Sequence, residues 1–252
     1  MRQDCDKKIT IDTGNTRCKL HVWKNNEVAE RFVFPINREN DIEKIIKDCG
    51  ATGCAVINIE RLGENTRDFL RGYFAENLVE VTGETPVPMK LSYKTPATLG
   101  ADRLAAAVAV QAEEPACDVL IADCGSAMTL DFVDADANYM GGSISPGVRV
   151  RLSSLHSQIP ALPAVEEKGD TPLLGYDTPT SIRSGVVMGM ASQIIGTFLK
   201  LRKEKKNLCL IMTGGDAPLI KPFIDSDIVG EIKEYKDLVA KGLLLILDYN
   251  LQ

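Results

Sequence analysis

Histidine is scarce in this sequence, whose 252 residues include only His21 and His156. The chain has seven cysteines, an odd number, and no C-x-x-C pair. These shortages argue against a zinc site, a disulfide framework and a Ser-His-Asp or Cys-His mechanism. We expect most of the thiols to pack as small apolar side chains in a reducing compartment.

Long apolar runs and an excess of basic charge are also missing. The apolar run over residues 243–247 is far too short to span a bilayer, and the charged N-terminus lacks the apolar core of a signal peptide. The formal net charge of −6 argues against a large nonspecific nucleic-acid surface, because clustered lysine and arginine are needed to neutralise phosphates. We therefore expect a cytoplasmic protein that binds neither membrane nor nucleic acid.

The sequence does contain one pattern twice: an apolar run that ends in aspartate, followed by a glycine turn with small polar residues. The first copy surrounds Asp12 and Gly14, and the second surrounds Asp123 and Gly125. Each turn joins a buried strand to a roughly alternating segment, so each copy predicts a β-hairpin and not the strand-to-helix turn of a P-loop. A single turn of this kind is more often an ordinary hairpin. Two copies in matching contexts favour a shared ligand.

The chemistry of the two turns indicates what that ligand is. Backbone amides left open by a glycine turn attract anions. Aspartate beside phosphate is unfavourable unless a cation lies between them. The repeated pattern therefore predicts a site for a metal–phosphate ligand.

Both halves of the chain are predicted to open with three strands and to continue as alternating helices and strands. In the first half, helices are expected near residues 42–49, 66–76 and 101–112, and in the second half a Pro-rich loop over residues 160–179 precedes a long helix. This order predicts a duplicated α/β unit with a cleft between the copies. Five apolar residues of the long helix recur every fourth position, which favours a core role over an interface: Ile182, Val186, Met190, Ile194 and Phe198.

The order and spacing of six motifs resemble those of the type III pantothenate kinases, within the acetate kinase, sugar kinase, Hsp70 and actin superfamily. The motifs are Asp12-Thr13-Gly14-Asn15-Thr16, Gly100-Ala101-Asp102-Arg103, Asp123-Cys124-Gly125-Ser126-Ala127, residues 141–147, Thr178, and Thr213-Gly214-Gly215-Asp216. The resemblance covers nearly the whole chain. One departure is Ser126, where the family usually has threonine, and the hydroxyl is kept.

This resemblance implies an α/β fold of two duplicated actin-like (ribonuclease H-like) domains, residues 1–116 and 117–252. Each domain would have a mixed five-stranded sheet flanked by helices, with the cleft between the domains. The implied activity is ATP-dependent phosphorylation of pantothenate to 4′-phosphopantothenate, the first step of coenzyme A biosynthesis. The resemblance also implies Mg²⁺ with the ATP, a monovalent cation (K⁺ or NH₄⁺), and a homodimer whose substrate pocket is completed across the interface.

Roles for individual residues follow from the same resemblance. Asp102 corresponds to the general base, Asp12 to a residue that acts on Mg²⁺ through water, and Asp123 to the monovalent-cation residue. The ATP-binding positions would be Asp12, Thr13, Gly14, Asn15, Thr16, Arg17, Cys18, Lys19, Ser126, Gly214 and Gly215. The pantothenate-binding positions would be Tyr93, Gly100, Ala101, Asp102, Arg103 and Thr178.

The residue chemistry alone is also consistent with simpler roles. Asp102 and Thr178 could cap helices, Arg103 could form a surface ion pair, and Tyr93 could be a half-buried loop aromatic. Two alternatives to the pantothenate kinase function also remain: another small-molecule kinase of the same superfamily, or a nonenzymatic nucleotide-binding regulator. The complete substrate motif argues against the first of these, and the retained aspartates argue against the second.

Overall fold

The chain forms two compact units in the computed structural model, which describes residues 7–14, 17–38 and 40–252. The first unit comprises the chain up to Glu113 together with Asp237–Gln252, and the second is Glu114–Lys236. The domain boundary predicted after residue 116 lies three residues from this break. The last helix, however, is expected from the sequence in the second domain, whereas it belongs to the first unit.

A mixed five-stranded sheet forms the centre of the first unit. Its strand order is β3-β2-β1-β4-β5, in which β1, β2 and β3 are antiparallel and β4 and β5 continue parallel to β1. The strands are β1 (Lys7–Thr13), β2 (Arg17–Lys24), β3 (Glu27–Pro35), β4 (Gly53–Ile57) and β5 (Leu78–Val81). Strand β4 ends at Ile57, and Ile59–Arg61 then forms the short 3-10 helix η2.

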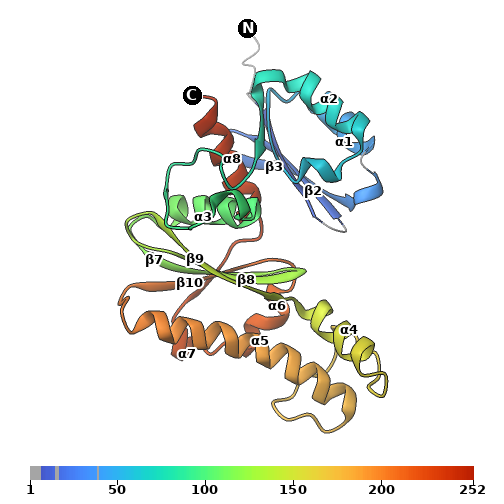
Figure 1. Ribbon diagram of the computed structural model, residues 1–252, viewed down its shortest axis with the longest axis vertical. Helices are drawn as coiled ribbons and strands as arrows, with labels where there is room; N and C mark the ends of the chain where they lie inside the picture. The colour runs from blue at the N-terminus through green and yellow to red at the C-terminus, as the bar shows by residue number, and fades with distance from the viewer. Residues whose placement is uncertain (1–6, 15–16, 39) are drawn as a thin grey trace. The chain divides into compact units, whose positions relative to one another are not determined.

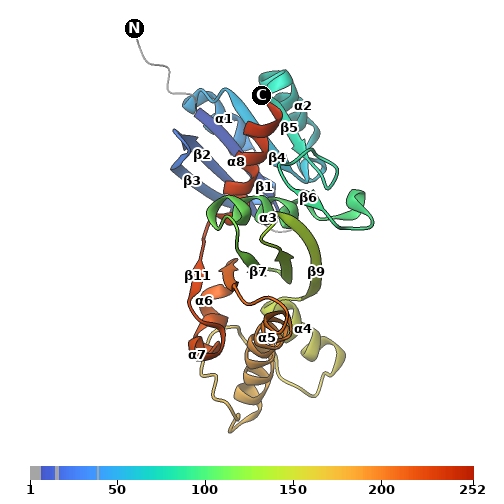
Figure 2. The ribbon, with the colours of Figure 1, turned by 90° about the vertical axis from the view of Figure 1, so that its left-hand side faces the viewer.

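Helices cover both faces of this sheet (Figures 1 and 2). On one face lie α1 (Asn40–Cys49) and α2 (Glu64–Phe74), and on the other lie α3 (Ala101–Glu113) and α8 (Leu238–Asn250). Strand β4 shows why both faces need cover, because Cys54 and Val56 belong to the core under α1 and α2, while Ala55 and Ile57 belong to the core under α3 and α8. A strand that is apolar on both sides requires a layer on each.

Helix α8 is fixed to the first unit by close packing and by an ionic contact at its start. A Cβ atom added to Gly242 would lie only 1.8 Å from the carbonyl oxygen of Ala105, so α3 and α8 cross at a distance that only glycine allows. Asp237, which precedes α8, accepts a 2.7 Å hydrogen bond from Nε of Arg31 and lies 3.1 Å from Nε2 of the buried His21. These contacts explain why the final helix returns to the first sheet.

The connections of the first unit contain short elements that the sequence did not predict. The segment between β5 and α3 contains strand β6 (Lys90–Leu91) and the 3-10 helix η4 (Pro96–Thr98). Two further 3-10 turns are η1 (Ile36–Arg38) and η3 (Ala75–Asn77). All of these elements are too short to give an apolar period.

The five strands of the second unit repeat the order of the first, as β9-β8-β7-β10-β11, in a sheet that has six strands and not the predicted five. Strands β7, β8 and β9 are antiparallel, and β10 and β11 continue parallel to β7. They are β7 (Asp118–Cys124), β8 (Ala127–Val133), β9 (Asn138–Pro146), β10 (Leu208–Thr213) and β11 (Ile232–Glu234). The duplication predicted from the two hairpins is therefore present in the topology.

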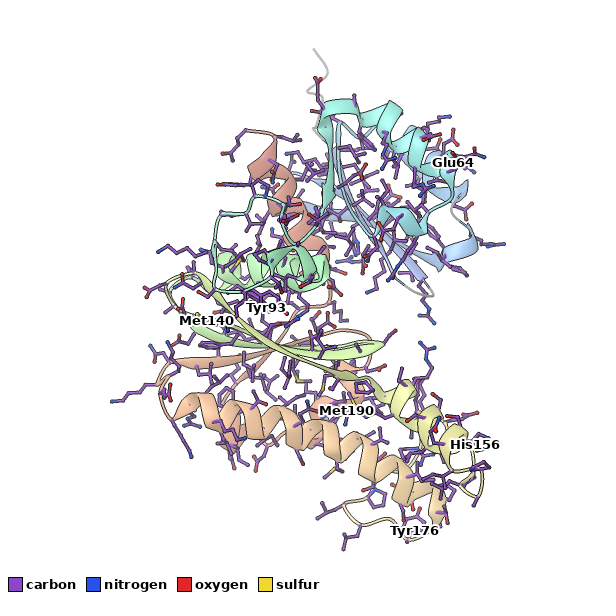
Figure 3. All side chains as sticks on the ribbon, viewed as in Figure 1. Glu64, Tyr93, Met140, His156, Tyr176 and Met190 are labelled. Atoms are coloured by element: carbon purple, nitrogen blue, oxygen red, sulfur yellow. The ribbon has the colours of Figure 1, made fainter. Side chains whose placement is uncertain are left out.

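The helices of the second unit are α4 (Val148–Gln158), α5 (Thr178–Arg202), α6 (Ala217–Ile220) and α7 (Ser226–Val229). The five apolar residues at every fourth position of α5 are all buried in one core cluster, which confirms the core prediction; Met190 among them lies between α5 and the sheet (Figure 3). By length and composition α5 would suffice to cross a membrane, but half of its apolar window is buried inside the protein, as in a core helix.

Candidate functional site

The first predicted phosphate turn joins β1 to β2, and its charged residues face each other across the hairpin. Asp12 and Lys19 are directly opposite in the antiparallel register, and Nζ of Lys19 lies 3.3 Å from Oδ2 of Asp12. Burial raises the pKa of Asp12, Lys19 opposes that shift, and the nearby carboxylate of Asp102 adds to it. A cation placed beside Asp12 would offset both the burial and the repulsion.

Asp12 and Asp102 thus influence each other although they are far apart in sequence. One ends a central strand and the other lies in the first turn of α3, both within the first unit. The structure therefore brings the predicted metal carboxylate and the predicted base into electrostatic range. The family resemblance implies this proximity, but no sequence spacing reveals it.

The turn itself is closed by backbone contacts. Gly14 donates its N–H to the carbonyl of Arg17 at 2.9 Å, while the side chains of Thr13 and Cys18 are completely buried. Any contact of Cys18 with a nucleotide would therefore involve its backbone. Arg17 is exposed. Asn15 and Thr16, which the resemblance places among the ATP-binding positions, lie outside the described residues.

The predicted substrate segment forms the N-terminal end of α3. Asp102 is exposed, and its Oδ1 accepts a 2.8 Å hydrogen bond from the N–H of Arg103. A Cβ atom on Gly100 would lie 2.5 Å from the same Oδ1 atom, so the carboxylate folds back over this glycine. A capping role for Asp102 is consistent with this contact, yet the side chain stays accessible to a substrate.

Arg103 is not the surface residue that its type alone suggests. Its side chain is 5% exposed, and the guanidinium carbon lies 6.0 Å from the centre of the Tyr93 ring. A cation over an aromatic face is attracted by the ring quadrupole, and the contact orients both side chains. The structure thus brings together Tyr93, Asp102 and Arg103, as the predicted substrate site requires.

In the second unit, three glycine-containing segments approach each other closely. A Cβ atom on Gly214 would lie 2.4 Å from the carbonyl oxygen of Cys124 and 2.5 Å from Oδ1 of Asp123, and one on Gly147 would lie 2.1 Å from the carbonyl oxygen of Gly125. Gly214 also has a φ of +92°, a conformation that favours glycine. The turn after β7, the start of α4 and the turn after β10 therefore form one compact site.

Backbone hydrogen bonds hold the three segments together. The N–H of Gly147 donates to the carbonyl of Ser126 at 3.1 Å, and the N–H of Asp216 donates to that of Cys124 at 2.8 Å. Ser126 itself is exposed, so its hydroxyl is accessible. The site thus brings together four predicted residues: the ATP-binding residues Ser126, Gly214 and Gly215, and the cation residue Asp123.

Asp216 links this site to an adjoining cavity. Its carboxylate accepts a hydrogen bond from the N–H of Val148, the first residue of α4; burial raises the pKa of Asp216, Glu167 adds to the shift, and Arg149 opposes it. Arg149 and Glu167 also line a cavity of about 470 Å³, whose walls include Leu152, His156 and Val165. His156 is labelled on α4 in Figure 3. The cavity is larger than a purine ring requires.

Thr178 is the first residue of α5 and is exposed, and it does not have the simpler role of helix cap that its residue type allowed. The cap is Asp177, whose side chain accepts a 2.9 Å hydrogen bond from the N–H of Thr180. The hydroxyl of Thr180 is in turn hydrogen bonded to the N–H of Asp177, and this reciprocal box satisfies two amides. Because Asp177 and Thr180 form the cap between them, the hydroxyl of Thr178 is not needed for capping and is available for another role.

Sequence reasoning missed several polar residues beside these sites. Asn58 and Arg61 both contact the first hairpin, and in the second unit Arg149 and Glu167 interact with Asp216, the last residue of the motif at residues 213–216. The six cysteines in the described residues are free, and burial raises the pKa of Cys54 and of Cys124, as expected for packed thiols. Among the same residues no cluster of three or more histidine, cysteine, aspartate or glutamate side chains suits a metal ion.

Comparisons with known proteins agree with this architecture. A family model described as type III pantothenate kinase matches residues 8–200. A type III pantothenate kinase of Phocaeicola vulgatus is 37% identical over 242 residues, which cover 96% of this chain and 98% of that protein.

Two solved structures bear on the fold. A ROK hexokinase of Thermus thermophilus has a TM-score of 0.56 at 11% identity, over 97% of this chain and 99% of that one. A Campylobacter jejuni protein of the Baf family has a TM-score of 0.62 at 20% identity, over 96% and 98% of the two chains. The predicted actin-like α/β fold is confirmed.

Proposed function

This chain belongs to the type III pantothenate kinase family, and from that premise we propose that it phosphorylates pantothenate with ATP. The product is 4′-phosphopantothenate, and the reaction is the first step of coenzyme A biosynthesis. The observation that carries the assignment to particular residues is the N-terminal end of α3. There an accessible carboxylate, Asp102, adjoins the packed pair of Arg103 and Tyr93.

Asp102 is the proposed general base for the primary alcohol of pantothenate. Phosphoryl transfer requires the acceptor oxygen in line with the γ-phosphate and a group to receive its proton. Asp102 is exposed and lies within the electrostatic range of Asp12, so it is available on the side where the phosphate turn lies. Its contact with the N–H of Arg103 holds the carboxylate in one orientation.

Arg103 and Tyr93 are proposed to bind pantothenate. The planar guanidinium presents paired N–H donors that match the geometry of the substrate carboxylate. Its packing against the Tyr93 ring restricts the guanidinium before the substrate arrives. Gly100 and Ala101, which precede the base, would bring the α3 backbone close to the same substrate.

The first hairpin is proposed to bind the ATP phosphates, with Lys19 as the positive charge and Asp12 as the residue that would hold Mg²⁺ through water. The half-buried Asp12 carboxylate fits a hard cation, because burial and Asp102 both disfavour its negative charge, and Lys19 is the main group that offsets them. Bound Mg²⁺ would supply charge neutralisation at the phosphates. The positions proposed to surround the phosphates are Thr13, Gly14, Asn15, Thr16, Arg17 and Cys18, of which Gly14 uses its own N–H in closing the turn.

The second unit is proposed to bind the rest of the nucleotide. Ser126 would contact phosphate, and Gly214 and Gly215 allow the close backbone approach of the nucleoside, for which the adjoining cavity has room. Asp123 would hold K⁺ or NH₄⁺. A carboxylate surrounded by turn carbonyls provides the oxygen ligands that such a cation prefers, and the cation would add positive charge near the phosphates.

We also propose a cytoplasmic homodimer in which Thr178 reaches the pantothenate pocket of the second copy. Support comes from the exposed start of α5 and the strongly exposed side chains that precede it: Leu173, Leu174 and Tyr176. Tyr176 lies at this end of the helix in Figure 3. Apolar surface of this kind is typical of a contact with another protein surface.

The decisive test measures ADP release by the purified chain with Mg²⁺ and K⁺, in the presence and absence of pantothenate. We expect release only with pantothenate. Asp102→Asn should lower kcat on the order of 10²- to 10⁴-fold, because the amide cannot accept the proton. The amide oxygen can still accept the bond from Arg103, so nucleotide binding should be kept.

Glu64→Gln is the matched control, since Glu64 is an exposed carboxylate in the first turn of another helix of the same unit. It should behave like the unchanged chain. Pantothenate-independent ADP release would refute the assignment of the reaction. Full activity of Asp102→Asn would refute only the assignment of the base.

The shared pocket can be tested by mixing Asp102→Asn with Thr178→Tyr, each of which should be weak alone. In a symmetric dimer, each mixed pair would contain one site with both residues intact. Random exchange of subunits should then restore about a quarter of the sites. Absence of any recovery after proven exchange would contradict a pocket completed across the interface.

A further inference from the structure

One carbonyl of the first phosphate turn accepts two side-chain hydrogen bonds from outside the turn. Nδ2 of Asn58 donates to the carbonyl oxygen of Thr13 at 3.2 Å, and Nη1 of Arg61 donates to the same oxygen at 3.3 Å. Neither donor belongs to any motif of the sequence. Both follow β4, the parallel neighbour of β1, and Asp12 lies opposite Ile57 in that register. The ends of two parallel strands therefore bring these residues to the turn.

The local fold fixes both donors in place. Asn58 has a left-handed backbone with φ of 53° and ψ of 42°, which asparagine tolerates better than most residues. Its carbonyl accepts a 3.0 Å hydrogen bond from the N–H of Arg61, so the chain turns back at once toward the hairpin. Ile59 and Leu62, which flank Glu60 and Arg61, are buried in the core under α1 and α2. Core packing thus holds the segment from which the two side chains extend.

The shared carbonyl controls the turn because a peptide group is planar. The carbonyl of Thr13 and the N–H of Gly14 are the two ends of one peptide unit, and that N–H closes the turn on Arg17 at 2.9 Å. Two donors on the carbonyl fix the plane of the peptide and polarise it, which strengthens the bond at the other end. The hydroxyl of the buried Thr13 has no partner in the described part of the chain, so this side chain gives the turn no comparable anchor.

The charge of Arg61 matters as well. Lys19 forms an ion pair with Asp12, and Asp102 adds a second negative charge nearby. A site that binds the phosphates of ATP requires further positive charge. Arg61 brings its positive charge to Thr13, the residue next to Asp12. A guanidinium has five N–H donors, and the contact with this carbonyl uses one of them.

We propose that Asn58 and Arg61 are positioning residues for nucleotide binding: they hold the Thr13–Gly14 peptide so that the phosphate turn is formed before ATP arrives. The role depends on the proposed function only in taking this hairpin as the phosphate site. A turn that must be ordered by its own ligand binds that ligand more weakly, because part of the interaction energy orders the chain.

The test measures binding of the non-hydrolysable ATP analogue AMPPNP with Mg²⁺ by calorimetry, together with the KM values for ATP and pantothenate. Arg61→Ala should weaken AMPPNP binding about 10- to 100-fold, as expected for loss of a hydrogen bond from a charged donor. Asn58→Gly should weaken it about 3- to 10-fold, since glycine keeps the left-handed backbone and removes only a neutral donor. The KM for ATP should rise in parallel, while the KM for pantothenate stays unchanged.

Two further variants separate positioning from general damage. Arg61→Lys should recover much of the affinity, because an ammonium group retains a charged donor. Arg71→Ala is the matched control, since the exposed Arg71 guanidinium directs its hydrogen bonds, within the described residues, to Glu80 of the same unit. It should leave AMPPNP affinity unchanged.

The proposal is overturned if Arg61→Ala and Asn58→Gly bind AMPPNP as the unchanged chain does. It is also overturned if both KM values rise equally, or if Arg61→Lys is as weak as Arg61→Ala. If the unchanged chain binds AMPPNP but does not phosphorylate pantothenate, the proposed function fails. The affinities of the variants then still decide the positioning role.

Discussion

Replacement of Gly214 by alanine should destabilise the second unit and weaken nucleotide binding. The added Cβ would lie 2.4 Å from the carbonyl oxygen of Cys124, 2.5 Å from its carbonyl carbon and 2.5 Å from Oδ1 of Asp123. All three distances are shorter than any ordinary contact, and two involve backbone that cannot rotate away. The backbone also has a φ of +92°, which alanine adopts only with strain.

The cost has two parts. A left-handed backbone costs a residue other than glycine about 1–2 kcal/mol. Forcing an extra methyl group into a packed site costs about 1–3 kcal/mol more. The sum of about 2–5 kcal/mol corresponds to a fall of about 4–20 °C in Tm for a chain of this size. Relief of the overlap would displace Asp123 and the turn after β7, so ATP affinity should fall as well.

Gly215→Ala is the internal control for this experiment. A Cβ on Gly215 would meet no atom within 4 Å, and its φ is not in the left-handed range. Its Tm without ligand should lie within about 2 °C of that of the unchanged chain, as for ordinary surface substitutions. Equal Tm values for Gly214→Ala and Gly215→Ala, measured by calorimetry without nucleotide, would refute the packing argument.

Two further outcomes follow from the first unit. Burial lowers the pKa of His21 in the folded chain below the ordinary value of about 6.5. As the pH drops below about 7, the unfolded chain therefore binds a proton at this histidine more readily than the folded chain, and the stability of the fold should decrease. His21→Gln should flatten this dependence of Tm between pH 7 and 5, whereas His156→Gln, which alters an exposed side chain, should retain it. Arg103→Lys should raise the KM for pantothenate about 10- to 100-fold with an unchanged KM for ATP, since lysine lacks the planar donor fork; equal effects on both would contradict the assignment.

The main strands and helices could be predicted because their apolar periods are long. Strands β1 and β7 and helices α3 and α5 are all buried along the predicted positions. The destination of α8 was predicted wrongly, because the sequence shows that this helix is apolar but not which sheet face lacks a cover. Gly242 and the contact of Asp237 with His21 and Arg31 decide that question, and both depend on residues distant in sequence.

The individual site residues show the same division between local and distant information. Thr178 suits the cap of α5 by residue type, but Asp177 is as good a cap and gains the reciprocal bond from Thr180. Other contacts join residues that are ten or more positions apart in the sequence. These are the packing of Arg103 against Tyr93 and the hydrogen bonds of Asn58 and Arg61 to Thr13. Such contacts depend on strand register and loop path, which a sequence pattern does not specify.

The two hairpins occupy equivalent places in their sheets but differ at one cross-strand position. Lys19 lies opposite Asp12 in the first hairpin, and Thr129 lies opposite Asp123 in the second. The first hairpin therefore provides its own ammonium group, 3.3 Å from the carboxylate, and the second hairpin has only a hydroxyl there. This difference favours Asp123 for the proposed monovalent cation, whereas the cation proposed at Asp12 is Mg²⁺ held through water.

The same difference makes the cation proposal testable. In Thr129→Lys, the new ammonium group should occupy the place relative to Asp123 that Lys19 has relative to Asp12, and so substitute for the cation. Activity without K⁺ should then approach that of the unchanged chain at saturating K⁺, and added K⁺ should have little effect. Thr129→Met, of similar length but uncharged, should still require K⁺, and Asp123→Asn should respond weakly to it. A Thr129→Lys protein that folds normally yet needs K⁺ as much as the unchanged chain would show that the cation binds elsewhere.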